Sequence, residues 1–195
     1  MRCLSELLAL FIVLIVCAAC WAQAPNSDNY KGIGRAATPE EIKALDISIG
    51  ISGKELPPGM GTAMDGAKIY AMKCAVCHGP GGEGGIASRL VGGQGTLTSA
   101  NPVKTIGSYW PFATTVYDYI NRAMPTGQGG SLVPTEIYAL TAFILYKNGI
   151  IKENDVIDAK SLPKVHMPNR NGFIPVRVED IPDIRKRGCQ IGNCP

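Results

Sequence analysis

Cys74-Ala75-Val76-Cys77-His78 is the stretch of sequence that decides the fold of this chain. A C-x-x-C-H run is typical of covalent haem attachment. One helical turn presents the two thiols along one edge of a porphyrin, where they can add to its vinyl groups, and the next residue then directs an imidazole at the iron. A zinc site would need further ligands, for which only His166 and a distant cysteine pair are available. We therefore expect one covalently attached haem c, bound by Cys74 and Cys77 and ligated by His78.

The sixth ligand of the iron must come from elsewhere in the chain. Met124 is the leading candidate, because it follows one predicted helix, precedes another, and is followed by Pro125, which keeps the backbone extended. A thioether ligand stabilises ferrous iron and raises the reduction potential, which suits an electron carrier. Met167 is the main alternative ligand and His166 a lesser one, and Met124 could instead be a buried gap-filling side chain.

Three helices are predicted around the motif. The first begins at Asp65 and ends before the glycine-rich run at Gly79. The second begins near Pro111 and runs to about residue 123, and the third covers about residues 134–147, where Asn148-Gly149 is a helix stop. We find no convincing alternating strand pattern.

To bury a haem, the first and last of these helices must cross. Gly66 permits their close approach, and Tyr70 can pack against Leu140 and Phe143. This order of helix, C-x-x-C-H, loops, Met-Pro and final helix resembles class I cytochromes c. The resemblance implies an all-α fold of three to four helices around one haem, with extended N- and C-terminal arms.

The class resemblance also bears on the surroundings of the haem. Arg89, Tyr109 and Trp110 are candidates for contact with the haem propionates. Cytochromes of this class often place a proline shortly after the motif, whose carbonyl orients the histidine. Here Ser88-Arg89-Leu90 occupies that place, so the carbonyl that holds His78 is left open.

The N-terminus predicts export. Arg2 and the apolar stretch 7–19 are typical of a signal peptide, with cleavage after Ala22, although retention as an anchor or lipidation of Cys20 remain alternatives. We expect a signal peptide (1–22), an N-terminal arm (23–64) with a short helix capped by Thr38, a cytochrome domain (65–149) and a C-terminal extension (150–195), in the periplasm without stable membrane insertion.

The remaining cysteines fit an exported protein, and the net charge limits the possible partners. After removal of the signal peptide and assignment of the motif pair to haem, Cys189 and Cys194 remain and can form a disulfide in an oxidising compartment. The formal net charge of +3 is too small to indicate binding to nucleic acid.

A closer resemblance covers about residues 30–175. Five stretches resemble the cytochrome subunit of sulfane dehydrogenase, the SoxD family: Leu56–Gly61, Val91–Leu97, Lys104–Pro111, Asp118–Pro125 and Met167–Phe173. The resemblance implies a molybdenum-cofactor dehydrogenase subunit as electron donor, acting on sulfane or sulfite, and a downstream electron acceptor. It also implies a non-catalytic electron-transfer subunit rather than an enzyme.

Two other functions use the same motif. The chain could be a stand-alone soluble shuttle between another dehydrogenase and a terminal oxidase, which needs only transient contacts. It could also be a gas-binding or catalytic haem protein, if no side chain closes the sixth position of the iron. Co-purification and carbon monoxide binding discriminate these alternatives.

Overall fold

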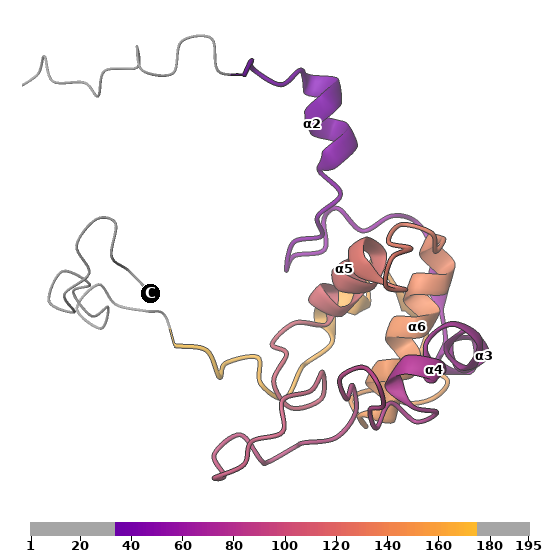
Figure 1. The fold of residues 1–195 in the computed structure, drawn as a ribbon, viewed down its shortest axis with the longest axis vertical. Helices are drawn as coiled ribbons and strands as arrows, with labels where there is room; N and C mark the ends of the chain where they lie inside the picture. The colour runs from indigo at the N-terminus through magenta and orange to yellow at the C-terminus, as the bar shows by residue number, and fades with distance from the viewer. Residues whose placement is uncertain (1–33, 175–195) are drawn as a thin grey trace, which may run out of the picture. The chain divides into compact units, whose positions relative to one another are not determined.

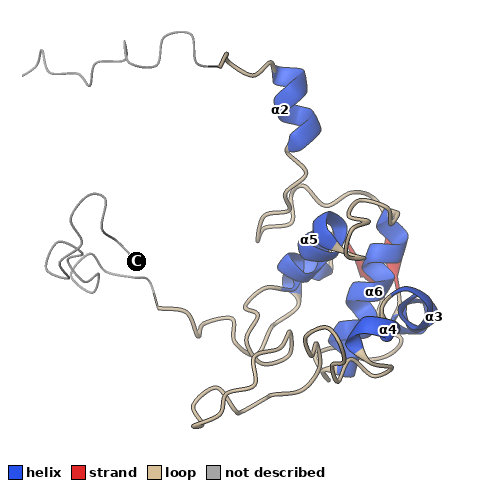
Figure 2. Ribbon diagram, in the orientation of Figure 1, coloured by secondary structure: helices blue, strands red, loops and turns tan. Residues whose placement is uncertain are grey.

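A computed structural model of the chain describes residues 34–174 (Figures 1 and 2). The chain divides into two compact units, Met1–Leu45 and Asp46–Pro195. In the first, the described part contains one helix, α2 (Pro39–Leu45). Thr38 and Glu41 form a reciprocal cap at its start: the Glu41 N–H donates to Thr38 Oγ1 at 3.2 Å and the Thr38 N–H donates to Glu41 Oε2 at 2.8 Å. The predicted cap at Thr38 is therefore confirmed.

The second unit begins with the helices that carry the haem motif. Helix α3 (Ala63–Lys73) starts two residues earlier than predicted, because the hydroxyl of Thr62 accepts a hydrogen bond from the Asp65 N–H and caps it. Cys74 leaves helical geometry with φ −123° and ψ −38°, and the short helix α4 (Ala75–His78) follows it. The motif thus sits at a break between two helices rather than inside one.

The remaining helices are α5 (Ala113–Ala123) and α6 (Pro134–Lys147). Helix α5 was predicted to begin near Pro111 and begins two residues later, because Phe112 is extended. Helix α6 has the predicted bounds, and Gly149, with φ +68°, follows its C-cap as expected of a helix stop.

Helix α3 packs directly on α6 (Figure 2). A Cβ atom at Gly66 would lie 1.9 Å from the backbone oxygen of Ala139, so only glycine fits there. One turn further along, the rings of Tyr70 and Phe143 have centroids 4.8 Å apart. The predicted crossing of the first and last helices at Gly66 is confirmed, and the fold is all-α as expected.

Two short strands were missed by the sequence analysis. Strand β1 (Met60–Gly61) pairs antiparallel with β2 (Ile157–Asp158), in the register Met60↔Asp158 and Gly61↔Ile157. Strands of two residues carry no alternating pattern, so the sequence gives no sign of them. Their pairing ties the segment before α3 to the segment after α6.

Both flanking segments contribute to the core of this unit. Before α3, Leu56 is buried and the Tyr138 hydroxyl donates to the Pro57 carbonyl at 2.9 Å. After α6, Leu162 of the 3-10 helix η2 (Leu162–Lys164) and Met167 are completely buried. Parts of the predicted arms therefore pack on the helices. None of the helices between residues 34 and 174 is long and apolar enough to cross a membrane.

Candidate haem pocket

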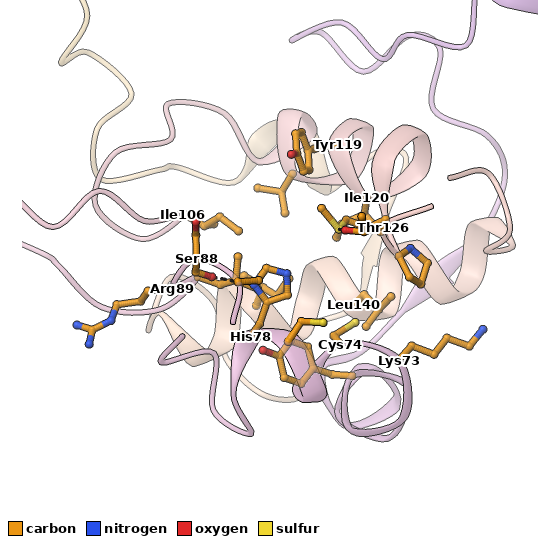
Figure 3. Close-up of a pocket in the computed structure, with 18 of the residues that line it drawn as sticks. Lys73, Cys74, His78, Ser88, Arg89, Ile106, Tyr119, Ile120, Thr126 and Leu140 are labelled. Carbon is orange, nitrogen blue, oxygen red and sulfur yellow. Dashed lines mark hydrogen bonds between the residues drawn. The ribbon is translucent and has the colours of Figure 1, made fainter. Parts of the chain in front are cut away.

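A cavity of about 680 Å³ opens between α4, the loop that follows it, the end of α5 and the inner face of α6 (Figure 3). Its volume lies in the range of cofactor pockets. Most of its wall is apolar and comes from all parts of the domain: Val76, Ile86, Leu90, Ile106, Val116, Ile120, Leu132, Leu140 and Ile144. Such a wall presents a mainly apolar surface to whatever the cavity holds.

Both motif cysteines line this cavity, and both thiols are free. Burial raises the pKa of the Cys74 thiol to about 11, and the neighbouring Cys77 adds to the effect while Lys73 opposes it. Cys74 is therefore a neutral thiol at physiological pH. Neither a disulfide between these cysteines nor a cluster of three or more metal-binding His, Cys, Asp or Glu side chains is found within residues 34–174.

His78 also lines the cavity, and a hydrogen bond to the backbone holds its ring. Its Nδ1 atom lies 2.8 Å from the carbonyl oxygen of Ser88, which Figure 3 shows as a dashed line. A proton on Nδ1 leaves the other ring nitrogen, Nε2, with a lone pair for a metal. The carbonyl that the sequence analysis left open is thus that of Ser88, in the Ser88-Arg89-Leu90 stretch.

The Ser88 carbonyl is itself fixed by anchors on both sides. The Ala87 N–H donates to the Cys77 carbonyl at 2.9 Å, and the Leu90 N–H donates to the Gly82 carbonyl at 2.9 Å. Tyr70 adds a further tie, because its hydroxyl donates to the Gly79 carbonyl at 3.0 Å. These hydrogen bonds fix the loop after the motif in the position that brings the Ser88 carbonyl to His78.

Met124 lines the cavity as the C-cap of α5. Its backbone is extended, with φ −120° and ψ 146°, as predicted for a residue before proline. The Thr126 hydroxyl lies 3.8 Å from the Met124 sulfur, and Figure 3 places Thr126 across the cavity from Cys74. The sequence analysis did not single out Thr126, although it directly follows the Met-Pro pair.

The alternative ligands lie elsewhere. Met167 is completely buried in the core and is not among the residues that line the cavity. His166 is exposed and does not line the cavity either. The structure thus brings Met124 together with the motif residues and leaves the other two apart from them.

The three residues suggested for propionate contact are placed differently. Trp110 and Arg89 line the cavity, but the Arg89 Nε donates to the Glu83 carbonyl at 2.9 Å and its guanidinium points away from His78 in Figure 3. Tyr109 does not line the cavity, because its ring packs edge-on against Phe173 with centroids 5.1 Å apart. Tyr119, which the sequence analysis missed, lines the cavity and packs edge-on against Trp110 at 5.7 Å.

These residues fit a haem. Free thiols, an imidazole with one nitrogen left for a metal and a thioether share one apolar cavity, and imidazole and thioether are the axial pair of electron-transfer haem proteins.

Comparisons with known proteins agree with this fit. Residues 61–144 match the family described as cytochrome c oxidase, cbb3-type, subunit III. Among solved structures, the chain is similar to the sulfane dehydrogenase SoxCD from Paracoccus pantotrophus, with 41% identity, a TM-score of 0.70, and coverage of 84% of this chain and 82% of that chain. The chain belongs to the SoxD-like c-type cytochromes. No curated protein sequence matches it.

As a SoxD-like cytochrome, the protein is an electron-transfer cytochrome of sulfur oxidation that binds haem c. Three of the sequence-based predictions fall outside the described residues and stay predictions. They are the signal peptide 1–22, lipidation of Cys20 and the disulfide between Cys189 and Cys194.

Proposed function

We propose that this SoxD-like cytochrome is a periplasmic mono-haem subunit that accepts single electrons from a molybdenum-cofactor sulfane or sulfite dehydrogenase and passes them to a downstream acceptor. The observation that carries the proposal is the shared cavity of Cys74, Cys77, His78 and Met124. When bound, haem c supplies a one-electron redox centre. The chain's own residues determine how it is held and how far water reaches it.

On this proposal each residue has a defined task. Cys74 and Cys77 would hold the haem through thioether links, His78 and Met124 would ligate its iron, and the Ser88 carbonyl keeps His78 in the tautomer that leaves Nε2 free. Thr126 donates toward the Met124 sulfur and restrains the thioether. If His78 and Met124 both ligate the iron, no position would remain open for a substrate, which suits electron transfer better than catalysis.

The family supports the proposed partner. The solved structure that the chain resembles at 41% identity is a sulfane dehydrogenase, SoxCD. In this chain, α2 exposes the side chains of Ile42 (55%) and Leu45 (83%), although it is stabilised by its own cap. An exposed apolar pair on a preformed helix suits a segment that grips a larger subunit, and we assign this task to residues 34–45.

A purification from the native periplasm tests the proposal. We expect molybdenum in the same fraction as the haem, and reduction of the haem when sulfite or a sulfane substrate is added. The paired change Ile42→Asp and Leu45→Asp is expected to remove molybdenum from the fraction without altering the haem spectrum. Ile51→Asp, which changes an exposed isoleucine of the other unit, serves as the matched control.

A clean single-chain cytochrome that stays oxidised under these conditions would instead support the soluble shuttle. Rapid binding of carbon monoxide to the reduced protein would support the gas-binding alternative, because it requires an open sixth position.

A further inference from the structure

Asn148, at the C-cap of α6, makes more contacts than a cap requires. Its side chain is buried, and its Nδ2 donates at 2.9 Å to the carbonyl of Ile144, which also accepts from the backbone N–H of Asn148 at 3.2 Å. The same Nδ2 also lies 3.2 Å from the Leu90 carbonyl, and its Oδ1 accepts from the Gly92 N–H at 3.0 Å. Two of the three contacts therefore reach into the loop that carries Ser88.

The orientation of the Asn148 amide is fixed by its neighbours. A Cβ atom at Gly107 would lie 2.0 Å from Asn148 Oδ1, so only glycine at position 107 leaves space for this amide, and Gln94 Nε2 donates to the same oxygen at 3.4 Å. Gln94 Nε2 donates to the backbone oxygen of Asn148 at 3.1 Å. On the far side of the loop, the Thr105 hydroxyl donates to the Gly92 carbonyl. The loop is thus clamped between Asn148 and Thr105.

The residue that Asn148 clamps lies close in sequence to Ser88, whose carbonyl meets His78. Leu90 is two residues from Ser88, its N–H is bonded to the Gly82 carbonyl at 2.9 Å, and its carbonyl is held by Asn148. The Ser88 carbonyl that meets His78 Nδ1 therefore lies between the anchored residues Ala87 and Leu90. Without Asn148, that end of the segment is held only by the Leu90 and Val91 N–H groups, which both donate to the Gly82 carbonyl.

We propose that Asn148 is a positioning residue for His78, which acts by clamping the loop whose Ser88 carbonyl accepts a hydrogen bond from the imidazole Nδ1–H. The proposal rests on the proposed function, because it takes His78 as the axial ligand. A firmly held acceptor makes an imidazole a more basic ligand and favours the oxidised iron. A loosened loop weakens that hydrogen bond and therefore raises the reduction potential.

The test compares Asn148→Ala and Asn148→Asp with Thr141→Val in the holoprotein. Thr141 lies in α6, is fully buried, and has a hydroxyl without a hydrogen-bond partner in the described part of the chain, so its change perturbs the helix but not the loop. Asn148→Asp keeps an acceptor for the Gly92 N–H and loses the donor to Leu90. It therefore provides the test even if Asn148→Ala does not accumulate as folded protein.

We expect Asn148→Ala to raise the ratio of reduced to oxidised protein at a fixed potential by about threefold or more. Both Asn148 variants should speed exchange of the His78 Nδ1 proton, measured by NMR, by about tenfold. Thr141→Val should change neither. A fall in thermal stability with an unchanged potential and unchanged exchange would show that Asn148 is only a helix cap and overturn the inference. A wild-type protein without a haem spectrum would overturn the proposed function itself.

Discussion

The imidazole of His78 lies against the backbone of Ser88, with 2.8 Å between Nδ1 and the carbonyl oxygen, although ten residues separate the two along the chain. The loop between them turns at Gly79, Gly82 and Gly84, all of which have positive φ. The acceptor is a main-chain oxygen, so the interaction does not depend on the identity of the side chain at position 88. It depends on how the loop is anchored.

The first prediction tests whether His78 depends on the side chain of Ser88 or on the backbone of its loop. Ser88→Ala should change the free energy of unfolding by less than about 0.5 kcal/mol and leave the reduction potential unchanged, because the carbonyl is retained. Ala87→Pro should destabilise by about 1–3 kcal/mol and shift the potential, because it removes the N–H that donates to Cys77. Denaturant unfolding and redox titration of both variants check this, and equal behaviour of the two would contradict it.

The second prediction concerns the crossing of α3 and α6. Gly66→Ala should destabilise the protein by about 3 kcal/mol or more, because its Cβ would lie 1.9 Å from a backbone oxygen that cannot move aside. Gly50→Ala is the control, since its Cβ would meet only the flexible carboxylate of Glu55, at 3.3 Å. Similar melting temperatures for the two variants would show that the helices do not pack this closely.

The third prediction concerns the segment after the last helix. Asn169 Nδ2 donates to the Tyr109 carbonyl at 2.7 Å and thereby ties this segment to the loop that presents Trp110 to the cavity. Asn169→Ala should cost about 1–2 kcal/mol and increase the solvent accessibility of Trp110, measured by fluorescence quenching in the haem-free protein. Asn171→Ala, an exposed neighbour in the same segment, should resemble the wild type. An Asn169 variant that is as stable as the Asn171 variant would refute the tie.

The fourth prediction is a pH dependence at Glu136. The Val133 N–H and the Lys73 ammonium, at 3.1 Å and 3.0 Å, hold the pKa of this carboxyl below its ordinary value. Because the pKa is lowered on folding, its stabilisation is complete above the ordinary value and is lost as the pH falls through the folded-state pKa. Glu136→Gln should therefore be less stable by about 0.5–1 kcal/mol at neutral pH, and the difference should vanish in acid. A difference that grows in acid would have the wrong sign.

Much of the fold could be predicted because it depends on local chemistry. Gly66 and Tyr70 indicated the helix crossing, and Asn148-Gly149 marked the end of α6, where the structure has it. The start of α5 was predicted near Pro111, two residues early, because proline suits both the first turn of a helix and the extended chain before it.

The parts of the site that could not be predicted depend on contacts between distant segments. Loop geometry carries no sequence period, and three features depend on it. They are the carbonyl that meets His78, the contact of Asn148 with Leu90, and the position of Tyr109 outside the cavity. Met124 and Met167 both precede proline, so local sequence alone does not separate them. Their different burial in the tertiary structure does.

The most direct test of the account is the spectrum of the oxidised protein in two methionine variants. Met124→Ala should lose the weak far-red absorption of thioether-ligated ferric haem and bind carbon monoxide readily when reduced, because its sulfur lines the cavity. Met167→Leu, a volume-conserving change in the core, should keep that absorption and cost less than about 1.5 kcal/mol of stability. Retention of the absorption in Met124→Ala together with its loss in Met167→Leu would contradict the account.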